Sequence, residues 1–162
     1  MFPLFAMLWQ SDAKIVDLKD GYVRVETASY SLEVPKGWEV SRETSFGQRE
    51  FEGSTGRMSA MTANAGAKPD WDRLYQTSLY FIMREKKGKA TPYKLGKTDT
   101  GFNTCSFSIL DDSGFAERRY VLLHNPAGPL LALSVKIPDR KREKELAASF
   151  DRMIKSAKFG RS

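Results

Sequence analysis

Apolar and polar residues alternate along the early part of the chain, as they do in strands that bury one face. The alternation covers Tyr22–Thr27 and again Tyr30–Val34, and a period of two places every second side chain on the same face of a sheet. Pro35-Lys-Gly-Trp38 interrupts the second run, because proline cannot donate a ladder hydrogen bond and glycine permits a tight turn. We therefore predict two short strands and a turn that carries Trp38 back toward the core.

Several further segments also have strand patterns. Phe46–Phe51 and Met58–Ala63 have the spacing of a hairpin joined through Gly53–Gly56. Leu130–Ile137 is almost continuously apolar, which is typical of a central strand. The remaining predicted strands are Tyr93–Thr98, Phe102–Leu110 and Ala116–His124, with a turn at Asp111–Gly114.

Two segments have the apolar spacing of helices. Asp70 precedes the first as a candidate N-cap, and Gly88 is expected to end it in a left-handed conformation. Asp139, after Pro138, is expected to cap the second. The apolar stripes are Trp71, Leu74, Tyr75, Leu79, Ile82 and Met83 in the first helix, and Leu146, Phe150, Met153, Ile154 and Ala157 in the second. Strands followed by a covering helix, twice over, predict an α+β fold with a mostly antiparallel sheet.

The length of 162 residues suits one domain, which we place at residues 15–162. Residues 1–14 contain an apolar run, Phe2–Trp9, followed by small residues at Ser11 and Ala13. This segment is interpreted either as a truncated export signal, since it lacks a basic n-region, or as an N-terminal tail. We expect an extracytoplasmic location, periplasmic or secreted, in preference to a cytoplasmic one.

The net charge of +6 is concentrated in one part of the chain. Between Arg84 and Lys97 there are six basic residues and one acidic residue, Glu85, so this segment carries +5. Such a cluster can bind an acidic protein, a phosphate backbone or anionic headgroups. The alternative is a solvated helix end. The basic residues are Arg84, Lys86, Lys87, Lys89, Lys94 and Lys97.

The order of these segments resembles a known family. Its residues are the strand and turn Tyr30-Ser-Leu-Glu-Val-Pro-Lys-Gly-Trp38, the hairpin around Asp111-Asp-Ser-Gly114, the strand Leu130–Pro138 and a closing helix ending Ile154-Lys-Ser-Ala-Lys-Phe159. This arrangement resembles the PsbP-like α/β/α sandwich, shared by the extrinsic photosystem II protein and a Ran-binding nuclear-import factor. The resemblance implies a docking or accessory role without a common catalytic set, and neither specific partner transfers to this chain.

Residues with catalytic or metal-binding chemistry are few. Cys105 and His124 could form a thiol-hydrolase pair, but a buried thiol and a strand-end histidine are the favoured interpretation. A single cysteine and a single histidine argue against a zinc site, and Asp111 and Asp112 suit a turn better than a calcium site. No glycine-rich phosphate loop precedes a helix. We expect no cofactor and no metal.

The sequence therefore predicts a non-enzymatic protein-binding or accessory module. Its partner is expected to be an acidic protein; a nucleic acid is not expected, and a membrane surface is an alternative that needs no spanning segment. The alternative function is a carrier that holds an apolar or amphipathic ligand between the first helix and the sheet, with Trp71 and Tyr75 lining the groove unless they serve core packing. The predicted partner-binding residues are Arg84, Lys86, Lys87 and Lys89.

Overall fold

The computed structural model describes residues 13–85 and 88–160. The chain first forms most of a small antiparallel sheet, whose fourth strand comes from the C-terminus. Burial alternates along its second and third strands, as the hydrophobic pattern predicts. In spatial order the strands are β1 (Lys14–Asp17), β2 (Tyr22–Glu26), β3 (Tyr30–Pro35) and β12 (Lys158–Phe159).

The second sheet is larger and is also antiparallel in every pair. Its central strand is β11 (Pro129–Lys136), which confirms the prediction from its apolar run. The strands in spatial order are β4 (Glu39–Val40), β5 (Gln48–Glu52), β6 (Arg57–Asn64), β11, β10 (Ala116–His124), β9 (Asn103–Leu110) and β7 (Lys89–Ala90), and β8 (Lys94–Lys97) also pairs with β9.

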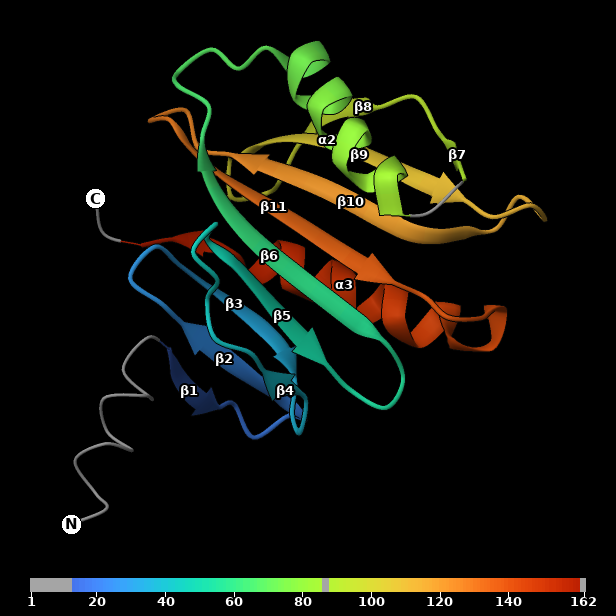
Figure 1. Ribbon diagram of the computed structural model, residues 1–162. Coiled ribbons are helices and arrows are strands. Elements are labelled where there is room, and N and C mark those ends of the chain that lie inside the picture. The colour runs from blue at the N-terminus through green and yellow to red at the C-terminus, as the bar shows by residue number, and fades with distance from the viewer. Residues whose placement is uncertain (1–12, 86–87, 161–162) are drawn as a thin grey trace.

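The helices lie on opposite faces of the large sheet (Figure 1). Helix α2 (Trp71–Glu85) lies over β9 and β10, while α3 (Glu143–Ser156) lies behind the sheet and also packs on β3. The described residues thus form the predicted α/β/α arrangement, with the small sheet beside α3. No helix in this described part is long and apolar enough to cross a membrane.

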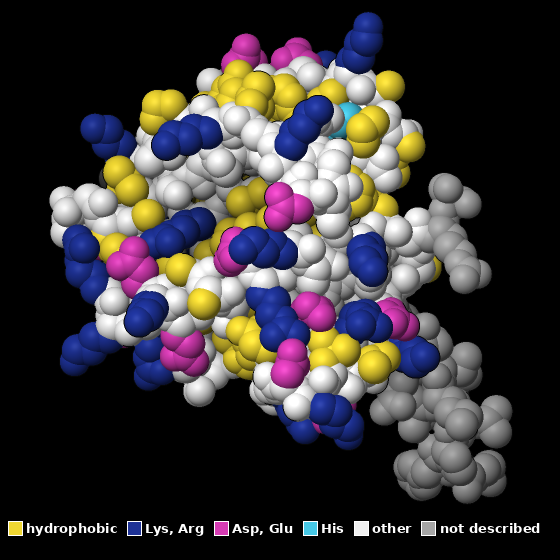
Figure 2. Space-filling model, turned by 180° about the vertical axis from the view of Figure 1, so that it is seen from behind, with side chains coloured by type: hydrophobic (Ala, Val, Ile, Leu, Met, Phe, Trp, Pro, Cys, Tyr) yellow, Lys and Arg dark blue, Asp and Glu magenta, His cyan; other side chains and the backbone are white. Residues whose placement is uncertain are grey.

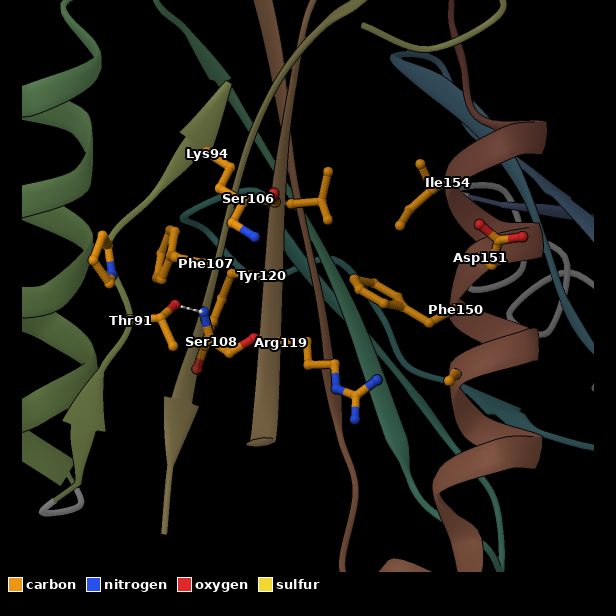
Figure 3. A pocket seen from close by; sticks show the side chains of 13 residues that line it. Thr91, Lys94, Ser106, Phe107, Ser108, Arg119, Tyr120, Phe150, Asp151 and Ile154 are labelled. Atoms are coloured by element: carbon orange, nitrogen blue, oxygen red, sulfur yellow. Dashed lines mark hydrogen bonds between the residues drawn. The ribbon is translucent and has the colours of Figure 1, made fainter. Parts of the chain in front are cut away.

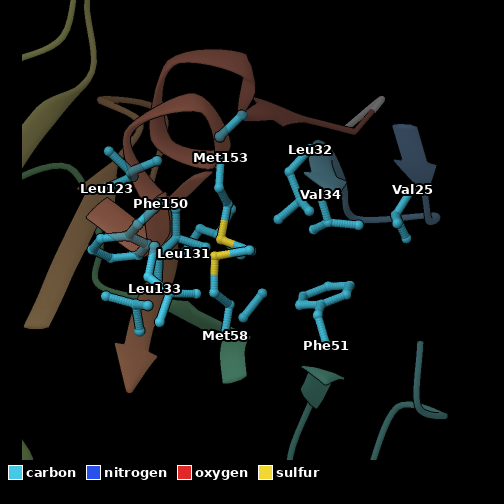
Figure 4. Packing of buried hydrophobic residues seen from close by; sticks show 14 of the residues in the cluster. Val25, Leu32, Val34, Phe51, Met58, Leu123, Leu131, Leu133, Phe150 and Met153 are labelled. Carbon is cyan, nitrogen blue, oxygen red and sulfur yellow. The ribbon is translucent and has the colours of Figure 1, made fainter. Parts of the chain in front are cut away.

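The main core lies between the small sheet, the large sheet and α3. Leu32 and Val34 face Phe51, and Met58 and Met153 point toward each other (Figure 4). All five side chains are at most 1% exposed. Such burial stabilises a fold by about 25 cal/mol per Å² of apolar surface removed from water. This core joins the two sheets into one domain.

The predicted helix starts are confirmed, and one predicted helix end is wrong. The Asp70 carboxylate accepts a hydrogen bond from the Arg73 amide at 3.0 Å, and Asp139 accepts one from the Arg142 amide at 3.1 Å. Asp139 caps a 3₁₀ turn, Arg140–Arg142, that leads into α3. Gly88 does not have a positive φ; instead, a Cβ at this position would lie 2.7 Å from Ile109 Cγ2. The glycine is needed for close approach of the chain to β9.

Candidate binding surfaces

Helix α2 is held to the sheet mainly through its N-terminal half. The Trp71 ring lies 5.9 Å from the His124 ring in an edge-to-face arrangement. Tyr75 lies 5.1 Å from Phe107, and its hydroxyl donates to the Thr91 carbonyl at 2.6 Å. These contacts are those of core packing, which is the alternative interpretation of Trp71 and Tyr75. Neither residue lines the cavity described below.

A hydrogen bond between side chains also fixes the first turn of α2. Tyr93 donates its hydroxyl hydrogen to Asp72 at 2.6 Å, and this bond raises the pKa of Tyr93 to about 12. The Tyr93 ring lies 5.1 Å from the Tyr75 ring. The start of the helix is therefore tied to the segment that precedes β8.

The second half of α2 exposes two aromatic rings to solvent. Tyr80 is 62% exposed and Phe81 is 61% exposed, and their ring centroids are 5.4 Å apart. The Arg84 guanidinium lies 5.4 Å from the Tyr80 ring centroid, within the range of a cation–π contact. We call Tyr80, Phe81 and Arg84 the aromatic patch.

The structure places two of the four predicted basic residues. Arg84 belongs to the aromatic patch, and Lys89 is exposed at the start of β7. Lys86 and Lys87 lie outside the described residues. Sequence analysis missed Tyr80 and Phe81, although both fall outside the apolar stripe of the helix and so are expected on its outer surface.

Cys105 and His124 do not have the arrangement of a nucleophile and its base. The His124 side chain is buried, and its Nε2 lies 2.7 Å from the Gly66 carbonyl while Nδ1 lies 3.3 Å from the Asn103 amide nitrogen. Cys105 is also fully buried, and loss of solvent raises the pKa of its thiol to about 11. The thiolate needed for nucleophilic attack is therefore disfavoured.

Native Cys105 should react slowly with iodoacetamide at pH 7. A thiol pKa raised from 9 to about 11 lowers the thiolate fraction about a hundredfold. The rate should then rise about tenfold per pH unit up to pH 11, since the thiolate is the reacting form. Alkylation followed by intact mass measures the rate, with the denatured chain as control. A native rate equal to that of the denatured chain at pH 7 would contradict the burial.

The acidic turn is structural. Asp111 accepts hydrogen bonds from the Ser113 hydroxyl at 2.6 Å and from the Phe115 amide at 3.0 Å. The bond from Ser113 is the main cause that lowers the pKa of Asp111. These bonds confirm the prediction of a turn. Within residues 13–85 and 88–160, no group of three His, Cys, Asp or Glu side chains is placed to hold a metal.

A cavity of about 520 Å³ lies between α3 and the edge of the large sheet formed by β8, β9 and β10 (Figure 3). When the molecule is seen from behind the view of Figure 1, hydrophobic side chains are visible in a hollow among lysine and arginine side chains (Figure 2). We call this cavity the α3 groove. It lies on the face of the sheet opposite α2. The sequence offered no signal for it, since its residues come from separate elements.

Comparison with known proteins identifies the fold. No protein-family model and no curated protein matches the chain. Among solved structures, the chain is similar to cyanobacterial PsbP from Synechocystis sp. PCC 6803, with a TM-score of 0.56 and 16% sequence identity. The match covers 92% of this chain and 93% of that one. At this identity the likeness concerns the fold alone, and it confirms the architecture expected from the sequence.

Proposed function

We propose that this chain, which has the PsbP-like fold, is a non-enzymatic binding or accessory module that docks an acidic protein partner through the aromatic patch on α2. The observation that carries the proposal is the exposure of Tyr80 and Phe81 beside Arg84. Large apolar rings on a surface cost solvation free energy unless a partner covers them. The fold likeness to cyanobacterial PsbP supports the general class, since the resemblance to the PsbP-like family implies a docking or accessory role.

The patch has the composition of a binding hot spot. Aromatic and arginine side chains are enriched at the centre of protein interfaces, where they contribute most of the binding energy. Arg84 supplies a cation, and Lys89 supplies a second exposed positive charge from β7. A partner that fits this chemistry would present an apolar pocket for the rings and carboxylates for the cations.

The docking surface is tested by replacing Phe81 with alanine and, separately, Arg84 with glutamate in the full chain. Each variant should recover at least about tenfold less of a specific partner, because a hot-spot truncation costs about 2 kcal/mol or more. Wild-type and variant proteins serve as baits in extracytoplasmic extract of the native host, followed by quantitative mass spectrometry. We expect that compartment because the apolar run and the small residues before Lys14 fit a truncated export signal, the alternative being an N-terminal tail.

The matched control is Phe46→Ala, since Phe46 is 84% exposed and precedes β5, away from α2. This variant should keep the full amount of partner, and all three variants should keep the wild-type melting temperature within experimental error. A partner recovered equally by wild type, Phe81→Ala and Arg84→Glu would contradict the surface. A partner found only in cytosolic extract would contradict the location.

A further inference from the structure

The α3 groove has an apolar side and a polar side. Phe150 and Ile154 project into it from α3 (Figure 3), and Val121 and Ala147 extend this apolar lining. The sheet side carries two serine hydroxyls and two cations. These polar groups belong to Ser106 and Ser108 of β9, Lys94 of β8 and Arg119 of β10.

Strand register explains why the polar groups gather on one face. Arg119 is opposite Ser108, whereas Lys94 and Val121 flank Ser106 on the two sides of β9. Cross-strand partners share a face of the sheet, so these side chains form two neighbouring rows. These two rows lie beside α3 and are not covered by it, because that helix packs against β3 and β11.

Arg119 is held in place before any ligand arrives. Its Nη2 donates to Glu143 at 2.7 Å, and its Nε donates to the Ala116 carbonyl at 3.4 Å. Among the described residues, Nη1 has no hydrogen-bond partner, and the guanidinium lies in the space between the sheet and α3 (Figure 3). A fixed guanidinium with a remaining donor is suited to bind an oxyanion.

The acidic groups at the groove are already paired. Asp151 lines the rim and forms an ion pair with Lys155 at 2.8 Å, and Glu143 is the partner of Arg119. Lys94 is exposed at the opposite rim. An anionic ligand would therefore meet a second cation in Lys94 as well as the hydroxyl donors of Ser106 and Ser108.

We propose that the α3 groove binds an amphipathic carboxylate, with the carboxylate on Arg119 and the two serine hydroxyls and the apolar body against Val121, Phe150 and Ile154. The volume of about 520 Å³ is within the range of sites for small organic ligands. This site is separate from the aromatic patch, because α2 and α3 lie on opposite faces of the sheet (Figure 1). The proposed ligand site is therefore additional to the proposed docking surface on α2.

Methyl NMR of the full chain titrated with octanoate tests the site, with octan-1-ol as the uncharged probe. Octanoate should shift the methyl signals of Val121 and Ile154 and leave that of Ile15, a residue of β1, unchanged. Arg119→Gln should weaken octanoate binding about tenfold or more, because it removes a charge-assisted hydrogen bond. The affinity for octan-1-ol should be unchanged in that variant.

Arg118→Gln is the matched control. It removes the same charge from the neighbouring position of β10, where alternation directs the side chain to the opposite face. It should bind octanoate as the wild type does. Ala147→Phe, which fills the groove, should abolish the methyl shifts that octanoate and octan-1-ol cause. The proposal is overturned if octanoate gives no groove shifts at millimolar concentration, if octan-1-ol binds as tightly, or if both arginine variants lose affinity equally.

Discussion

Replacement of Phe51 with alanine is expected to lower the free energy of unfolding by about 3–5 kcal/mol, the usual cost of removing a buried aromatic ring. Phe51 is fully buried, and its ring lies between the large sheet and Leu32 and Val34 of the small sheet (Figure 4). Its cross-strand neighbour Met58 is also buried, so little surrounding chain can relax into the space. The loss of stability should come from weaker packing between the two sheets.

Urea unfolding followed by circular dichroism measures the loss. Phe46→Ala is again the control: it removes the same side chain from a site that is 84% exposed, so stability should change by about 0.5 kcal/mol or less. Equal midpoints for Phe51→Ala and wild type would show that the small sheet does not pack on Phe51. A loss in the Phe46 variant as large as in the Phe51 variant would show that exposure does not govern the cost.

The long strands and both helices could be predicted because each has a local pattern. Alternation in Tyr30–Val34 reflects one buried face, and the apolar run at Leu130–Ile137 reflects a strand covered on both faces. The N-caps at Asp70 and Asp139 are also local, since each carboxylate bonds an amide three residues ahead. Such features depend on neighbours in the sequence and not on the rest of the fold.

Two strands of only two residues each, β7 and β12, could not be predicted, because each forms by pairing with a strand far from it in the sequence. Lys158–Phe159 forms a strand only by pairing with Tyr30 and Ser31, more than a hundred residues earlier. Lys89–Ala90 pairs with the far end of β9. Two residues contain no periodicity, so hydrogen bonding to an existing strand decides their conformation. The division into two sheets was missed for the same reason, since local patterns do not specify which strands pair.

The two candidate sites also differ in how far the sequence could indicate them. Charge pattern pointed to Arg84 at the end of α2, and helical spacing could also have pointed to Tyr80 and Phe81 as its outward neighbours. The α3 groove had no sequence signal. Ser106, Arg119 and Phe150 belong to three elements, and only strand register and the position of α3 bring them together. Tertiary packing, which a single sequence does not reveal, therefore creates the groove.

The second large effect is expected at His124, which contacts the start of α2 and the chain that precedes this helix. Its Nε2 bonds the Gly66 carbonyl, an acceptor only, so this nitrogen carries the proton and Nδ1 accepts from Asn103. His124→Ala leaves these partners unsatisfied and removes the contact with Trp71. We expect a loss of about 2–4 kcal/mol in the free energy of unfolding, measured by urea denaturation.

His124→Phe separates the two causes, because it keeps a ring against Trp71 but cannot bond Gly66 or Asn103. It should regain only about 0.5–1.5 kcal/mol over the alanine variant. Hydrogen exchange should accelerate at residues 71–75 in both variants, since the chain before α2 loses its attachment. Partner recovery should then fall although the aromatic patch is unchanged. If His124→Phe matches wild type in stability and exchange, the buried hydrogen bonds do not position α2.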